Sequence, residues 1–424
     1  MAEKIMTFNN AIQKFNIYRK LPLPATNECM TKNDVFTYLN TDPSSYTSYQ
    51  NNQLVPESGF KNTKLTVGSG FNAMVRGITS YDYNLYIGGQ FTTYNGYTAN
   101  RIIKMSYTGQ VDTSFISGSG FNGHVESIEV TSTGKLMVCG GFTVYRGVSA
   151  NRIIRLNIDG TLDSSFNSGS GFNGVVRQMR VLSDNSIIAV GGFTSYNGTS
   201  CNYICKITST GAVDTTFISN IGTGFNSIVA HINIFSPTEV LVGGYFKTFN
   251  GSTSRALIKL NTTGTVSTNY GTLINGPSNV QGVMATYVFP NGNILLGGGF
   301  TTYNGVSKNN LALISGQTLI SSFNQGEGPN NAVTSIQRVG TNKFLISGDF
   351  TTYNGLNYNK LVFLNDDSTI DTTFAQGGGF NSFARSSEVQ TDGKLLIGGD
   401  FTSYSGTPVN RLIRLNPNYS TDIL

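Results

Sequence analysis

The sequence has little charge, little histidine and no tryptophan. Its 424 residues contain 28 Lys and Arg against 23 Asp and Glu, and only 12% are charged, about half the ~25% usual in soluble domains. A net charge of +5 offers no basic stripe, so we expect no nucleic-acid partner. The 38% hydrophobic content excludes a disordered chain. No apolar run reaches the length of about 18 residues that a membrane-spanning helix needs.

A cleaved secretory signal is also missing. Lys4, Lys14 and Arg19 interrupt the apolar residues of the N-terminus, and Asn9-Asn10 stands where an apolar core would lie. We therefore expect a chain made in the cytoplasm and not exported by a cleaved signal.

The four cysteines do not have the spacing of a disulfide framework or a zinc site. On one face of a continuous strand, Cys201 and Cys205 would lie about 13 Å apart, too far to bridge. We expect buried structural thiols, with no metal and no cofactor. All four are Cys29, Cys139, Cys201 and Cys205.

The chain is rich in glycine, with 50 residues, and one phrase recurs through it, G-G-x-F-T-x-Y-N-G. The copies are spaced by about 51 residues and account for nearly everything after residue 67, which is typical of a repeat architecture. The seven copies lie at 88–96, 139–147, 190–198, 243–251, 297–305, 347–355 and 398–406.

Each copy contains four short strand-like runs separated by turn residues. In the second copy these are 125–131, 135–143, 151–158 and 162–166. Four strands per repeat of this length is the size of a propeller blade, whereas a β-helix needs shorter rungs. The sequence thus predicts an all-β fold, a seven-bladed β-propeller of four-stranded blades over residues 60–424.

The two ends of the repeat array predict how the ring closes. The last copy stops at LNPNYSTDIL, before a D-x-x-F strand, while Leu65 lies six residues before Phe71 as Phe166 does before Phe172. We expect residues 62–66 to supply the missing outer strand, so that residues 60–67 pair with the C-terminal blade at 410–416.

Individual motif residues have structural explanations. Paired glycines predict a close strand approach or a bulge, the following Phe and Tyr predict packing between blades, and Asn-Gly predicts a tight turn. Four aspartates precede the outer strand, and we interpret them as caps of their own turns rather than metal ligands. They are Asp112, Asp163, Asp214 and Asp371.

The copy GGFTVYRGVSANRIIRLNIDGTLDSSF at 140–166 resembles the delta-sixty repeat family almost throughout, and the likeness recurs seven times. The resemblance implies a β-propeller and no common catalytic motif. Residues 252–277 and 306–326 depart from the pattern, so we expect irregular outer edges in those two blades.

The sequence offers few candidates for chemistry. No catalytic triad order, zinc motif, phosphate loop or sialidase box is present, and we expect no enzyme and no catalytic residue. His124 and His231 fall at strand positions and are predicted to be packed. Asp349 and Asp400 vary a motif position in neighbouring copies and would lie side by side as a cation or polar-ligand site; the alternative is two solvated carboxylates at strand ends.

Residues 1–59 contain no repeat phrase. The pattern C-M-T-K-x-D-V…Y-x-x-N-Q-L-V-P resembles the N-terminal stretches of structural proteins from Bacteroidetes-infecting, crAss-like phages. That resemblance implies a virion component whose N-terminal segment docks on the particle. The residues expected to dock are Phe8, Phe15, Tyr18, Phe36 and Tyr38.

Three functions follow from these observations. The first is a phage virion protein, part of a tail, fibre or other surface component. Its partners would be other virion proteins through residues 1–59 and a host glycan or protein through the propeller, with a homo-oligomer following virion symmetry. The second is a bacterial cell-surface or secreted adhesin, and the third is a polysaccharide-active enzyme. The abundance of Tyr, Asn, Ser, Thr and Gly suits polar recognition and favours the first two.

Overall fold

The computed structural model describes residues 48–50, 53–55, 64–115, 119–277, 282–390 and 392–424. The chain divides into two units, Met1–Lys64 and Leu65–Leu424. In the first unit, β1 (Ser48–Gln50) pairs antiparallel with β2 (Gln53–Val55). Among the described residues, no helix has the length and apolar character needed to cross a membrane.

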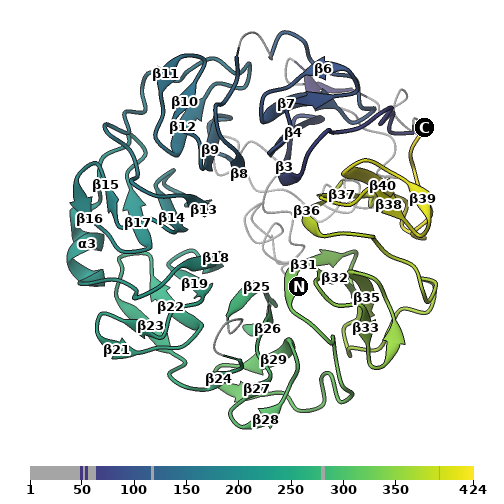
Figure 1. Cartoon of the computed structure of the whole chain (residues 1–424). Helices are drawn as coiled ribbons and strands as arrows, with labels where there is room; N and C mark the ends of the chain where they lie inside the picture. Colours follow the sequence, from purple (N-terminus) through teal and green to yellow (C-terminus); the bar gives the residue numbers. More distant parts are fainter. Residues whose placement is uncertain (1–47, 51–52, 56–63, 116–118, 278–281, 391) are drawn as a thin grey trace, which may run out of the picture. The chain divides into compact units, whose positions relative to one another are not determined.

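The second unit is a ring of seven antiparallel sheets, which we number as blades 1 to 7 in chain order (Figure 1). The first strand of each blade lies nearest the centre of the ring. Strand β3 contacts both β8 of blade 2 and β36 of blade 7, and the other inner strands contact their neighbours in order, so the ring is closed. The predicted seven-bladed propeller is confirmed. The inner strands are β3 (Val75–Tyr81), β8 (Val125–Val130), β13 (Val176–Val181), β18 (Val229–Ser236), β25 (Val283–Val288), β31 (Val333–Val339) and β36 (Ala384–Val389).

The second strand of each blade is buried on both faces, which explains its continuous apolar run. In β9 (Leu136–Gly140) every residue is buried. The other second strands are β4 (Asn84–Gly89), β14 (Ile187–Gly191), β19 (Glu239–Gly244), β26 (Asn293–Gly298), β32 (Lys343–Gly348) and β37 (Leu395–Gly399). The third strands are β7 (Ile102–Ser106), β12 (Ile153–Leu156), β17 (Ile204–Ile207), β22 (Leu257–Asn261), β29 (Leu311–Ser315), β35 (Leu361–Asn365) and β40 (Leu412–Leu415).

The fourth, outer edge takes two forms. In five blades it is a single bridging pair, such as Leu156 with Leu162, and in blade 3 it continues into the helix α3 (Thr215–Ile221). Blades 4 and 5 lack the D-x-x-F element, and there the outer edge is a regular strand, β23 (Val266–Asn269) and β30 (Thr318–Leu319). The outer edges of blades 4 and 5 therefore differ from those of the other blades, as expected. The predicted irregularity is wrong, because these two blades have the regular outer strand.

The recurring phrase forms a small hairpin between the second and third strands of each blade. Asn95 and Gly96 at its turn have φ of 46° and 81°, as a two-residue turn of type I′ requires. Behind the turn, Phe71 packs against Phe91 and Tyr94 at 4.4 and 4.5 Å between ring centroids. The hairpins are β5–β6 (Thr93–Tyr94, Tyr97–Thr98), β10–β11 (Val144–Tyr145, Val148–Ser149), β15–β16 (Ser195–Tyr196, Thr199–Ser200), β20–β21 (Thr248–Phe249, Ser252–Thr253), β27–β28 (Thr302–Tyr303, Val306–Ser307), β33–β34 (Thr352–Tyr353, Leu356–Asn357) and β38–β39 (Ser403–Tyr404, Thr407–Pro408); β24 (Ile274–Asn275) pairs with β27.

Pairing of the two chain ends closes the ring, as predicted, because Leu65 bridges Ile423. The segment beside 410–416 is, however, not the predicted 62–66. The C-terminus itself occupies that edge, because Thr421 bridges Leu415. Leu65 then adds to it, donating its amide to the Asp422 carbonyl at 3.0 Å, as Phe166 does to Asp163 at 3.2 Å. The D-x-x-F turn of blade 7 is thus split between the two chain ends. The prediction missed this because no Phe follows Asp422 in sequence.

Candidate functional site

In every blade, the same backbone contact joins the end of the second strand to the residue before the inner strand. The glycine that ends the second strand of each blade lies so close to the inner strand that a side chain would clash: a Cβ on Gly191 would be 2.2 Å from the Val175 carbonyl oxygen, and one on Gly399 would be 2.0 Å from that of Phe383. The next residue donates its amide to the same carbonyl, as Asp400 does to Phe383 at 2.8 Å. The predicted close approach at the paired glycines is confirmed.

Each inner strand also has a bulge at its second residue. The register shifts there in all seven blades, for example between Val75 and Gly77 in blade 1. A bulged residue is left out of the ladder and its side chain is re-aimed. The bulge and the glycine together place three residues of each blade at one edge, which we call the rim. In blade order the rim residues are Met74, Arg76 and Gln90; His124, Glu126 and Gly141; Val175, Arg177 and Gly192; Ile228, Ala230 and Tyr245; Gly282, Met284 and Gly299; Ala332, Thr334 and Asp349; and Phe383, Arg385 and Asp400.

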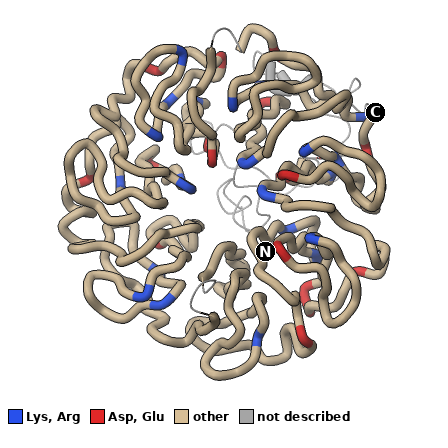
Figure 2. Tube along the Cα trace, viewed as in Figure 1, with Lys and Arg blue, Asp and Glu red and all other residues tan. Residues whose placement is uncertain are grey.

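The rim carries charged side chains on blades 6, 7, 1, 2 and 3, and we call the stretch over blades 6, 7, 1 and 2 the charged arc. Between blades 1 and 2, Arg76 donates to both carboxylate oxygens of Glu126 at 2.8 and 2.9 Å, and His124 lies 3.3 Å from the same carboxylate. Burial alone would raise the pKa of Glu126, but the hydrogen bond from His124 and the charge of Arg76 hold it below its usual value. Figure 2 shows charges of both signs around this side of the ring centre.

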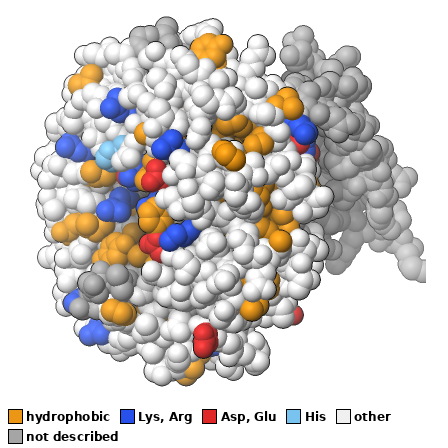
Figure 3. Space-filling model, turned by 45° about the vertical axis from the view of Figure 1, so that its right-hand side comes forward, with side chains coloured by type: hydrophobic (Ala, Val, Ile, Leu, Met, Phe, Trp, Pro, Cys, Tyr) orange, Lys and Arg blue, Asp and Glu red, His pale blue; other side chains and the backbone are white. Residues whose placement is uncertain are grey.

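Phe383 connects the charges of blades 6 and 7. The Arg385 guanidinium lies over its ring at 4.7 Å from the centroid, and the Lys360 ammonium lies at 5.3 Å. Lys360 follows the blade 6 hairpin and also donates to the Asp349 carbonyl at 2.9 Å. Cations at these distances are attracted to the aromatic face, so Phe383 holds two positive charges at the rim. Figure 3 shows basic, acidic and histidine side chains gathered on one face beside hydrophobic ones.

The predicted site residues Asp349 and Asp400 lie at equivalent rim positions of blades 6 and 7. Each is about one-third exposed and lies beside a cation of its own blade: Asp349 is 3.6 Å from Lys360, and Asp400 is 3.8 Å from Arg411. In the described part of the chain, no cluster of three or more His, Cys, Asp or Glu could hold a metal ion. Both carboxylates influence Arg385, whose pKa is lowered by burial and by the charge of Arg76 and raised in turn by the two aspartates. The arrangement offers hydrogen-bond acceptors, Asp349 and Asp400, together with a donor, Arg385, for binding polar groups.

Blades 4 and 5 form a contrasting stretch, the neutral arc, whose rim side chains are Ile228, Ala230, Tyr245 and Met284. The Tyr245 hydroxyl lies 3.8 Å from the Met284 sulfur across the blade boundary. Below the rim His231 is buried, with Nε2 2.9 Å from the Thr286 hydroxyl. Burial and the charge of Arg180 lower the pKa of His231 to about 3, so it is neutral at pH 7.

Comparison with known proteins places the chain in a family. A model described as a domain of unknown function (DUF5122) beta-propeller matches seven segments that together exceed half of the chain, at 84–115, 131–166, 182–217, 239–269, 290–314, 341–374 and 390–422. The chain belongs to the DUF5122 propeller family.

Solved structures support the propeller fold alone. The WD40 β-propeller domain of Doa1 is similar with a TM-score of 0.51 and 13% identity, covering 84% of this chain and 97% of that one. The computationally designed Ika8 protein is similar with a TM-score of 0.50 and 12% identity, covering 85% and 98%. No curated protein matches the sequence.

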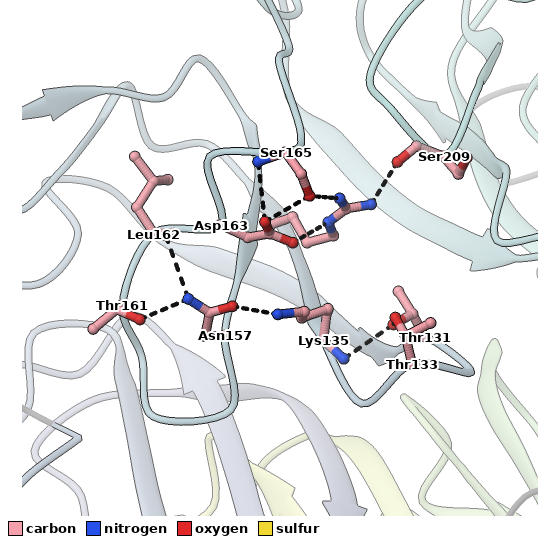
Figure 4. Close-up of polar contacts among 10 residues, drawn as sticks. Thr131, Thr133, Lys135, Asn157, Thr161, Leu162, Asp163, Ser165 and Ser209 are labelled. Atoms are coloured by element: carbon pink, nitrogen blue, oxygen red, sulfur yellow. Dashed lines mark hydrogen bonds and ion pairs between the residues drawn. The ribbon is translucent and has the colours of Figure 1, made fainter. Parts of the chain in front are cut away.

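The repeated aspartate of this DUF5122 propeller caps its turn, as predicted: one Asp163 oxygen accepts from the Ser165 amide at 3.0 Å and hydroxyl at 2.7 Å (Figure 4). The other oxygen accepts from Arg155 Nε at 2.8 Å, and Arg155 also donates to the Ser209 carbonyl of the next blade. Sequence reasoning missed this ion pair, although a Lys or Arg recurs eight residues before the aspartate. The same pairing joins Lys104 to Asp112, Lys206 to Asp214 and Arg414 to Asp422.

Two further motif features of the DUF5122 propeller were not foreseen. The Arg of each N-R pair has a left-handed backbone, with φ of 69° at Arg152, and its side chain donates to the Phe172 carbonyl of the next blade at 2.7 Å. The expected 13 Å separation of Cys201 and Cys205 is wrong, because the left-handed Tyr203 breaks the strand between them. A hydrogen bond with Cys201, together with burial, raises the pKa of the Cys205 thiol. Cys139, Cys201 and Cys205 are buried and free, as predicted.

Cys29 and the five residues expected to dock on a particle lie outside the described residues, as do residues 60–63 of the predicted closing segment. The docking residues are Phe8, Phe15, Tyr18, Phe36 and Tyr38.

Proposed function

We propose that this protein is a non-catalytic recognition propeller whose rim binds a partner molecule. The observation that carries the proposal is the asymmetry of the rim: the bulge and glycine repeat in all seven blades, yet the side chains placed there are charged in one arc and uncharged in the other. A ring serving only as a spacer needs no such difference. A binding site does, because a ligand contacts some blades and not others.

The particle role rests on the sequence of residues 1–59, which resembles phage structural proteins. In this proposal that segment docks on other virion proteins, the propeller carries the recognition surface, and copies of the chain follow the symmetry of the particle. The protein is then a virion component made in the host cytoplasm. The alternative is a bacterial surface or secreted adhesin, favoured by the frequent occurrence of delta-sixty propellers in exported proteins. The virion component and the adhesin would both use the rim to bind a partner molecule.

Glycoside hydrolysis is disfavoured by the surroundings of Asp349 and Asp400. A glycosidase needs one carboxyl group kept protonated by its environment beside a second that is ionised. Asp349 and Asp400 instead have matching surroundings, because each has a cation of its own blade within 4 Å. Two carboxylates in alike, partly exposed surroundings suit the binding of hydroxyl groups better than a division into acid and base.

Mass spectrometry of phage particles purified from an infected host tests the particle role. We expect the chain to co-purify with the capsid at constant stoichiometry through a density gradient, and a chain lacking residues 1–59 to be lost from the particle while remaining soluble. Recovery of the full chain only in bacterial surface fractions would favour the adhesin instead. Incorporation of the shortened chain at the normal level would refute docking through residues 1–59.

A further inference from the structure

The charged arc has two rim arginines, Arg76 and Arg385, and Arg385 has no carboxylate partner in the part of the chain that the structure describes. Within the described ranges, Arg76 and Arg411 each lie within 4 Å of a carboxylate, and so do Lys360 and His124. No ion pair joins Arg385 to any described carboxylate, and its side chain is exposed at the rim. A guanidinium held in this way keeps its N–H donors available for a ligand.

The backbone and the neighbouring side chains fix the position of Arg385. It is the bulged residue of β36, out of the ladder between Ala384 and Ser386. The Arg385 guanidinium carbon lies over the Phe383 ring at 4.7 Å from its centroid, and the Phe383 carbonyl in turn accepts a hydrogen bond from the amide of Asp400. Stacking of this kind pre-organises the planar fork that recognises carboxylates in a bidentate manner.

The surrounding charges limit what the ligand can be. Asp349 and Asp400 are 37% and 38% exposed, and Glu126 belongs to the same network. Partly exposed carboxylates accept hydrogen bonds from hydroxyl groups and repel a dense run of negative charge. A polyanion such as a nucleic acid or a heavily sulfated glycan therefore fits poorly. A hydroxyl-rich ligand with isolated negative charges fits both kinds of group.

We propose that the charged arc binds an acidic saccharide of the uronate or sialate type, with the sugar carboxylate on Arg385 and neighbouring hydroxyls on Asp349 and Asp400. The inference deepens the proposed function, since it names the ligand class for the recognition face. It applies equally to a virion component and to an adhesin.

Isothermal titration of the purified full chain with three oligosaccharide probes, containing galacturonate, glucuronate or sialate, tests the inference. Each is compared with its carboxyl-reduced counterpart and with heparin. We expect at least one acidic probe to bind, its reduced form to bind at least about tenfold more weakly, and heparin to bind more weakly than the acidic probe. Equal binding of acidic and reduced forms, preference for heparin, or no binding to any acidic probe overturns the inference. The particle-association experiment is unaffected by any of these results.

Two arginine variants locate the site. Arg385→Gln removes the unpaired guanidinium, and we expect the affinity for the acidic probe to fall about tenfold or more. Arg177→Gln is the matched control, because Arg177 is an exposed arginine at the same bulge position of blade 3 without the Phe383 platform. It should change the affinity by less than about twofold, as removal of a charge outside a site does. Equal losses in the two variants would show a general charge effect and refute the site.

The double variant Asp349→Asn, Asp400→Asn tests the carboxylates separately. We expect weaker binding of the acidic saccharide through lost hydroxyl contacts, together with stronger binding of heparin, because the rim loses two negative charges. Unchanged affinity for both probes would remove these aspartates from the site. Circular dichroism of every variant, matching that of the parent chain, ensures that a loss of binding is not a loss of fold.

Discussion

The charged and neutral arcs of the rim are built on the same backbone and differ only in side chains. In both, the second residue of the inner strand is bulged and the following strand ends in a glycine packed on a carbonyl. Yet Phe383, Arg385 and Asp400 occupy in blade 7 the places of Gly282, Met284 and Gly299 in blade 5. Since backbone hydrogen bonds hold the rim in place, most of its side chains can vary at little cost to the ring. Stability thus depends mainly on the repeated backbone contacts, whereas recognition depends on the side chains that vary between blades.

The largest effect should follow from disturbing the backbone that both arcs share. Gly399→Ala in the charged arc and Gly244→Ala in the neutral arc would each press a Cβ against a carbonyl oxygen, at 2.0 and 2.6 Å. We expect each to lower the free energy of unfolding by about 3 kcal/mol, measured by urea denaturation. Gly192→Ala is the control, because its Cβ would lie 4.0 Å from the nearest atom. A strong effect in one arc only would show that the backbone is not equivalent.

The pH dependence of stability should distinguish the histidine of the neutral arc, His231, from that of the charged arc, His124. Because His231 is buried with a pKa of about 3, the unfolded chain takes up its proton near pH 6.5 while the folded chain does not. Its contribution to stability is therefore full above pH 6.5 and is lost as the pH falls towards 3. We expect a loss of about 2 kcal/mol between pH 7 and pH 5, absent in His231→Asn.

The matched control is His124→Asn in the charged arc, where the partly exposed imidazole lies beside Glu126. This variant should retain the loss of stability that His231 causes, as followed by thermal denaturation across the same pH range. Identical pH dependence in His231→Asn and the parent chain would contradict the prediction.

A smaller difference should appear when one interblade contact is removed in each arc. Glu126→Gln leaves Arg76 and His124 without their carboxylate, and we expect a loss of about 1–2 kcal/mol, because Glu126 is 15% exposed. Tyr245→Phe removes only the hydroxyl near the Met284 sulfur and should cost less than about 0.5 kcal/mol. Chemical denaturation compares the two, and equal costs would show that the Glu126 network does not help to join blades.

The smallest effect on stability belongs to the proposed ligand contacts. Asp349→Asn and Asp400→Asn, alone or together, should change the free energy of unfolding by less than about 0.5 kcal/mol, because exposed ion pairs contribute little. Both pairs are longer than 3.5 Å and both carboxylates are more than one-third exposed. A large loss of stability on urea denaturation would assign these residues to the framework instead.

Most of the fold could be predicted from the sequence because the structure repeats the same local solutions. The Asn-Gly turns, the paired glycines and the turn-capping aspartates depend on contacts within one repeat, and seven copies make their pattern plain. Asp163 shows the limit: its cap to Ser165 is local and was foreseen, whereas its pairing with Arg155 joins two strands. Contacts between strands need a register that a single sequence does not state.

The site was harder to predict because it depends on departures from the repeat. Asp349 and Asp400 could be found as variants of one motif position. Their cations, Lys360 and Arg411, come from the start of the third strand, and nothing in the spacing indicates that this position returns to the rim. Arg385 was missed because its position is set by a bulge, an irregularity of pairing that leaves no mark in the composition of β36.

The split D-x-x-F turn makes one boundary of the ring unlike the other six. Elsewhere a covalent chain passes from blade to blade, but between blades 7 and 1 the main-chain link at the outer edge is made by hydrogen bonds, Leu65 to Asp422 and Leu424 to Leu65. A force applied to the N-terminal segment reaches the propeller at Leu65, so it acts first on these two hydrogen bonds. Pulling on that segment should therefore open the ring between blades 7 and 1. A peptide linker that joins the two chain ends there should raise the force required.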